Sequence, residues 1–144
     1  MDTTTAEELA DYIVKKCILD KHPVTNMQLQ SILYCIQRDC LKKTGKPAFY
    51  NEFSAWAFGP VIPSIYYKYL GFGVEPIDFD FGVICIDTET AEFIDPVIEK
   101  VRSMSPWDIV TETHKDGGAW KKIYKVNNPS GGDIIPKELI KKKG

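Results

Sequence analysis

The chain has 144 residues, 44% of them apolar, and a formal net charge of −2 at neutral pH. This length fits one domain over residues 1–144, which would bury about 70% of its unfolded surface without needing disulfides. The slightly acidic balance makes nucleic acid an unlikely partner, because that binding depends on Lys and Arg neutralising phosphates. No signal-peptide pattern and no apolar run of membrane-spanning length is present, so we expect a soluble, cytoplasmic protein.

The cysteines and histidines give no indication of a metal site. There is no CxxC pair, and His22 and His114 lie far apart in the sequence. We interpret the cysteines as buried thiols in a reducing compartment, and we expect neither a metal nor a cofactor. The four cysteines are Cys17, Cys35, Cys40 and Cys85.

Two amphipathic helices are predicted at the start of the chain. The first follows Thr5, which with Glu8 forms a capping box, and should end near Asp20. The second follows Thr25, with Gln28 in the box position, and should end at TGKP, residues 44–47. A short turn between them predicts an antiparallel pair.

The middle of the chain mixes extended and helical signals. Residues 52–57 are rich in aromatics and are predicted to be extended, and the GP at 59–60 is expected to turn the chain. A third helix should run from about 61 or 62 to 70, with Pro63 in its first turn. Alternation in residues 77–87 predicts one or two strands, which could form a small sheet or hairpin with the segment near Trp56.

The last third of the chain again has helical periodicity. One helix is expected from 88 to about 104, kinked or split at Pro96, and another from Ser105 with Trp107 and Val110 facing inward. Residues 119–125 indicate a further helical turn. The basic segment 137–144 is expected to be a short, solvated tail. The fold class that these elements predict is a mainly α, single compact helical domain with a minor β component.

Three segments carry a resemblance to a known family: TNMQLQSILYCIQ, FSAWAFGPVIPSIY and TETHKDGGAWKKIY. Together they resemble the Panacea domain family, the phage-associated, SocA-like antitoxins, over roughly residues 5–125. The chain departs from the family pattern at Ser31 and Ile32, and at Ala119, where the family usually has Pro before the late Trp. The matching positions are Thr25, Leu29, Gln30, Leu33, Tyr34, Gln37, Ala55, Trp56, Gly59, Pro60, Val61, Pro63, Tyr66, Thr113, His114 and Trp120.

The resemblance implies a helical antitoxin that forms a hetero-oligomer with a cognate toxin encoded beside it. Toxins paired with this family include membrane-acting peptides and small alarmone-synthetase-like enzymes. Some members resemble direct inhibitors, and at least one resembles an adaptor that delivers its toxin to a protease. We therefore expect toxin neutralisation by direct protein–protein binding, with the adaptor role as an alternative.

The aromatic stretch 52–73 supplies the candidate binding residues. Phe53, Trp56 and Tyr66 are expected to contribute to the core, while Tyr67 should point outward from its helix. Tyrosine is favoured at interfaces because it buries a large area and keeps a polar tip. The candidate partner-binding residues are Trp56, Phe58, Gly59, Pro60, Tyr67, Lys68 and His114.

Two other classes of function remain open from the sequence. An enzyme could use Glu112, His114 and Asp116 with Cys85 or Ser105 as nucleophile, but their spacing matches no catalytic motif, and we assign no catalytic residue. His114 is instead expected to cap the end of the helix that carries Trp107. A DNA-binding operon regulator could use the first two helices or the lysine-rich tail.

Overall fold

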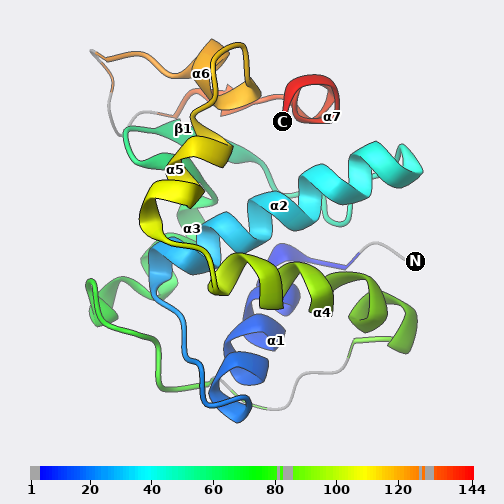
Figure 1. Ribbon diagram of the computed structural model, residues 1–144, viewed down its shortest axis with the longest axis vertical. Coiled ribbons are helices and arrows are strands. Elements are labelled where there is room, and N and C mark those ends of the chain that lie inside the picture. The colour runs from blue at the N-terminus through cyan, green and yellow to red at the C-terminus, as the bar shows by residue number, and fades with distance from the viewer. Residues whose placement is uncertain (1–3, 81, 83–85, 127, 129–131) are drawn as a thin grey trace.

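A computed structural model describes residues 4–80, 82, 86–126, 128 and 132–144 of the chain, and it is mainly α with a small sheet. The helices are α1 (Ala6–Leu19), α2 (Asn26–Thr44), α3 (Pro63–Lys68), α4 (Thr88–Arg102), α5 (Pro106–Thr113), α6 (Ala119–Ile123) and α7 (Lys137–Lys143). A 3₁₀ turn, Leu70–Phe72, follows α3. The strands are β1 (Phe53–Trp56), β2 (Gly59–Val61) and β3 (Ile134–Ile135). Figure 1 shows α2 crossing the centre, with α1 and α4 on one side and the sheet, α6 and α7 on the other.

The first two helices begin where local signals place them. Thr5 and Thr25 each accept a hydrogen bond from the backbone N–H three residues on, and the Glu8 and Gln28 side chains accept in return from the cap backbone. Both capping boxes are therefore confirmed. Gly45 ends α2 with a φ of 77°, a left-handed conformation that glycine adopts without a steric penalty.

Helix α2 is the centre of the core and contacts α1, α4, α7 and β2. Two buried glutamines on it bond to backbone groups elsewhere in the chain. The Gln37 side chain donates to the Phe49 carbonyl oxygen and accepts from the Ala48 N–H, each at 2.8 Å. Gln30 accepts from the Ile62 N–H at 2.9 Å. These side chains satisfy backbone groups that burial would otherwise leave unpaired, so they fix the segments on both sides of the hairpin.

The sheet has the order β2-β1-β3, with both pairs antiparallel. The expected turn at Gly59 and Pro60 was wrong, because both residues lie in β2 and the chain reverses at Ala57 and Phe58. Proline is tolerated in β2 because this is an edge strand, where a missing N–H need not break a ladder. Extended structure near Trp56 and a minor β component are confirmed, but the partners of β1 are β2 and β3 and not the described residues of 77–87.

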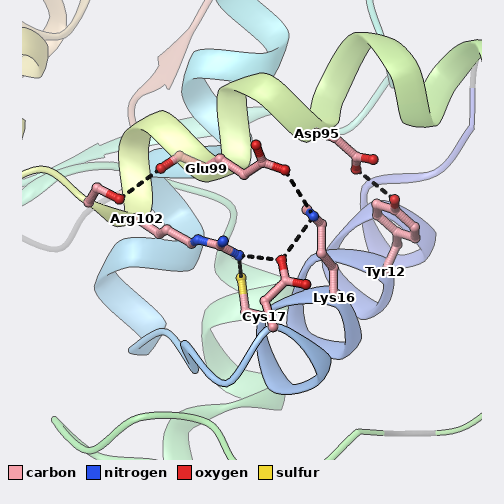
Figure 2. Close-up of polar contacts among 8 residues, drawn as sticks. Tyr12, Lys16, Cys17, Asp95, Glu99 and Arg102 are labelled. Carbon is pink, nitrogen blue, oxygen red and sulfur yellow. Dashed lines mark hydrogen bonds and ion pairs between the residues drawn. The ribbon is translucent and has the colours of Figure 1, made fainter.

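Polar side chains join α1 to α4 (Figure 2). The Tyr12 hydroxyl donates to Asp95 at 2.6 Å, and burial with this bond raises the pKa of Tyr12 to about 12. Lys16 pairs with Glu99 at 3.1 Å and with Asp20 at 2.9 Å. The Asp20 carboxylate also accepts a hydrogen bond from Arg102 of α4 at 2.8 Å. This network orients α4 on α1.

Three expectations about the C-terminal third are corrected. Helix α4 is not split at Pro96 but continues through it, because the packing of Ile94 and Ile98 in the core offsets the lost hydrogen bond. Trp107 and Val110 are exposed and do not face inward. The segment 137–144 is no solvated tail: it forms α7, which packs on α2 through the buried Ile140.

The expected strands in 77–87 are not found among the residues described there. Residues 77–80, 82, 86 and 87 have no strand assignment. The remainder of that segment, including Cys85, lies outside the described residues. The other three cysteines are buried free thiols, as expected.

Candidate partner-binding site

The β1–β2 hairpin presents Phe58 at its tip. Trp56 and Gly59 face each other across the strands, so Ala57 and Phe58 form the two-residue connection. Gly59 has a φ of 136°, which other residues rarely adopt, and a Cβ there would lie 3.5 Å from Nε2 of His114. The glycine therefore allows the tight reversal that leaves the Phe58 side chain 41% exposed.

Helix α3 places tyrosines next to this hairpin. Pro63 occupies the first turn, and Ile65 and Tyr69 are buried. Tyr67 points to solvent and is 60% exposed, as expected. Lys68 pairs with Asp11 of α1 at 2.6 Å, so its charge holds α3 on α1.

Four aromatic rings from the hairpin and α3 contact one another. The Trp56 ring lies 5.7 Å from Phe58, 5.2 Å from Tyr66 and 6.1 Å from Tyr67, measured between centroids. Trp56 is only 6% exposed and Tyr66 is half-buried, while Phe58 and Tyr67 reach the surface. The cluster is therefore anchored at its base and apolar at its surface.

A groove of about 330 Å³ adjoins Phe58. One wall is the start of α2, and the other is Met104, in the connection between α4 and α5, with the first turns of α5. Most of its lining is apolar, with a few polar atoms from Gln28 and from hydroxyl groups. The lining residues are Thr25, Met27, Gln28, Ser31, Phe58, Met104, Pro106, Ile109 and Val110. We call this groove, together with the exposed Tyr67 and Trp107, the aromatic face.

A second set of rings supports the hairpin from the side of α6. The Trp120 ring stacks between His114 at 3.7 Å and Tyr124 at 4.7 Å, centroid to centroid. Its indole N–H donates to the Trp56 carbonyl oxygen at 2.7 Å, a buried hydrogen bond. The segment TETHKDGGAWKKIY thus holds the segment FSAWAFGPVIPSIY in place.

His114 ends α5 as its C-cap residue, as expected, but its surroundings disfavour a cation. Burial lowers the pKa of the imidazole, and Lys121 acts in the same direction; a hydrogen bond with the Phe58 backbone opposes them. Nε2 is buried with no hydrogen-bond partner among the described atoms. His114 therefore acts on the aromatic face by supporting Phe58 and Gly59 from beneath.

The described residues do not assemble the catalytic group considered from the sequence. Glu112 pairs with Arg38 at 2.6 Å, while His114 faces Trp120. Ser105 caps α5 by accepting from the Asp108 N–H. Within the described ranges, no cluster of His, Cys, Asp and Glu could hold a metal ion. Nor does any helix of the described chain have the length and apolarity to cross a membrane.

Sequence reasoning found one side of the aromatic face and missed the other. Phe58 and Tyr67 were candidates, but the α5 side was not, because Trp107 and Val110 were placed in the core. Trp107 is 81% exposed. An eight-residue helix with three large apolar residues was a usable signal, since so short a helix rarely buries all of them.

Comparison with known proteins gives the family. Residues 29–121 match the model of the SocA-like antitoxin, Panacea domain. The antitoxin SocA of Caulobacter vibrioides (strain NA1000 / CB15N) is 29% identical over 136 residues, which cover 86% of this chain and 71% of that protein. No solved structure matches the chain significantly. The chain belongs to the SocA-like antitoxin family defined by the Panacea domain.

Proposed function

We propose that this protein is an antitoxin that neutralises a cognate toxin by binding it directly through the aromatic face. Membership of the SocA-like family supports the antitoxin role. The observation that carries the direct-binding mechanism is the exposure of large apolar side chains around one groove, on elements that are otherwise well packed.

The composition of the aromatic face is typical of a protein interface. Met27, Phe58, Tyr67 and Trp107 are all exposed, and three of the four are aromatic. Tyr, Trp, Phe and Met are enriched in interface cores, and Trp and Tyr often dominate the binding energy there. Clustered apolar exposure of this kind marks interaction sites on soluble proteins.

The proposed mechanism is steric. A specific interface buries ~800 Å² on each partner, or about 20 residues. The groove can take one or two side chains of the toxin, and the flanking α3 and α5 would supply the remaining contact area. By covering the active surface or the substrate entrance of the toxin, the antitoxin would form an inactive hetero-oligomer without any cofactor. The family resemblance suggests an alarmone-synthetase-like or membrane-acting toxin as the occupant.

Co-expression with the neighbouring gene tests this function. The neighbour is induced alone and together with this protein, and growth and co-purification are followed. Growth arrest that this protein relieves, with a stable co-eluting complex, is the expected result. Relief without a complex, accompanied by protease-dependent loss of the toxin, would replace direct neutralisation with the adaptor role. A harmless neighbour would contradict the antitoxin proposal.

Two tyrosines provide a matched pair of variants. Tyr67→Ala removes a ring that contacts Trp56 and Tyr66 beside the groove, while Tyr50→Ala removes a ring that is 71% exposed and lies outside the aromatic face. Loss of an interface hot spot costs at least 2 kcal/mol, so Tyr67→Ala should weaken the complex about 30-fold. Tyr50→Ala should leave the affinity unchanged. Equal effects of the two variants would contradict the placement of the interface.

A further inference from the structure

The net charge of −2 conceals an uneven distribution along the chain. Residues 69–99 contain eight Asp and Glu and no Lys or Arg, whereas residues 115–143 contain eight Lys against three acidic residues. Further lysines, Lys42, Lys43 and Lys46, lie at the end of α2. The average charge therefore says little about what either part of the surface attracts.

The fold brings these lysines to one end of the molecule. Helix α7 contacts both α2 and α6, and Figure 1 shows α7 above the C-terminal half of α2, with α6 to its left. The Lys141 ammonium lies next to Gly45, which ends α2. The Lys115 ammonium donates to the Gly144 carbonyl oxygen at 2.8 Å. We call this region the basic end; its exposed lysines are Lys42, Lys43, Lys46, Lys115, Lys121, Lys122, Lys125, Lys141, Lys142 and Lys143.

Few carboxylates form ion pairs at the basic end, although Glu89 and Glu92 of α4 line the same hollow as Lys43 and Lys46. Lys137 pairs with Glu52 at 2.7 Å, and Lys142 lies 3.9 Å from Glu138. Among the described residues, no other ion pair involves a lysine of α6, α7 or the end of α2. Helix dipoles favour a lysine at the C-terminal end of each helix. They do not explain why three lysine-bearing helix ends converge, since like charges at close range repel.

The composition of this surface favours a polyanion over a folded protein. Protein interfaces are depleted in Lys and enriched in Arg and aromatic residues, and all the basic side chains here are lysines. Lysine ammonium groups suit phosphate oxygens, while base reading relies largely on bidentate Arg, Asn or Gln contacts. We propose that the basic end binds the phosphate backbone of a nucleic acid without reading its sequence.

This site is separate from the aromatic face and does not depend on the proposed toxin interaction. Lys42 lies about 22 Å along α2 from Met27, at 1.5 Å per residue. The lysines at the end of α2 can thus bind a partner while the groove is occupied. The expectation that nucleic acid is no partner rested on the net charge and on a solvated tail. In the folded protein, α7 holds its lysines in a fixed arrangement, so less entropy is lost when they bind.

The test measures fluorescence anisotropy of a labelled DNA duplex of about 20 base pairs, and of RNA of the same sequence, between about 50 and 200 mM salt. The full chain should bind with a Kd of about 10⁻⁶–10⁻⁵ M at the lowest salt, without preference for sequence. Affinity should fall steeply as salt rises, because counterions are released from the phosphates.

Two triple variants with the same change in net charge make the test specific. Lys42→Gln, Lys122→Gln and Lys141→Gln remove one lysine from each helix of the basic end. Lys15→Gln, Lys21→Gln and Lys100→Gln form the control elsewhere on the protein. The first triple should weaken binding and reduce the slope of log affinity against log salt by about 3, one for each lost phosphate contact. The control triple should keep the slope of the unmodified chain, and circular dichroism confirms that both variants fold.

Three outcomes would overturn the proposal. In the first, neither DNA nor RNA binds at the lowest salt. In the second, both triple variants lose affinity equally, which means that binding follows the net charge and not the basic end. In the third, the first triple variant weakens the toxin complex and leaves nucleic-acid binding intact. That result would assign the basic end to an acidic protein surface.

Discussion

Replacing Trp120 with phenylalanine removes one buried hydrogen bond and part of one stacked ring. Trp120 is almost fully buried, and its indole N–H donates to the Trp56 carbonyl oxygen at 2.7 Å. Phenylalanine keeps a ring between His114 and Tyr124 but has no N–H. Losing a partner inside the protein costs about 1–3 kcal/mol, since the remaining polar group has no water to bond. We expect Trp120→Phe to lower the free energy of unfolding by about 2 kcal/mol.

Urea unfolding followed by far-UV circular dichroism measures the change in the free energy of unfolding. In thermal unfolding, the same loss of about 2 kcal/mol should lower the Tm by about 5–8 °C in a protein of this size. Trp107→Phe is the matched control, because Trp107 is exposed and should change stability by no more than about 0.5 kcal/mol. If Trp120→Phe is as stable as the unmodified protein, or if Trp107→Phe is the more damaging variant, the proposed link between Trp120 and the hairpin is refuted.

Two further predictions concern the support of the hairpin tip. Gly59→Ala should cost about 1–3 kcal/mol in urea unfolding, because alanine is strained at a φ of 136°; an unchanged midpoint would contradict this. The folded state lowers the pKa of His114, so the unfolded chain binds the proton more readily and stability should fall as pH drops below about 6.5. His114→Gln should reduce the pH dependence of unfolding between about pH 7 and pH 5, and an identical pH profile in both proteins would show that His114 does not cause it.

The elements that the sequence predicted well are those with local causes. Thr5 and Thr25 cap their helices through residues three positions away, and Ser105 with Pro106 starts α5 in the same way. These signals need no knowledge of the rest of the fold. The family segments were recognised for the same reason, since each is a short continuous stretch of chain.

The errors occur where distant segments decide the structure. Pro60 has a local turn signal, but pairing with Ala55 places it in an edge strand. The lysines of α7 resemble a disordered terminus, but one buried residue, Ile140, anchors the helix on α2. Tertiary contacts of this kind override local propensity.

The candidate site shows the same limit. The helical spacing of Trp107 and Val110 predicts that they share a side of α5, and it cannot say whether that side is covered. In the structure Val110 lines the groove with Met27, which was not a candidate, while Trp107 is exposed beside it. Apolar periodicity alone therefore does not separate a core stripe from a binding stripe.

Hydrogen exchange of the free protein and of its complex with the toxin tests the central claim most directly. If the toxin binds the aromatic face, amide exchange should slow in residues 26–31, 56–67 and 106–110, while α7 should exchange at the same rate in both states. Protection confined to α1 and α4, or to α6 and α7, with no change around the groove, would contradict the account.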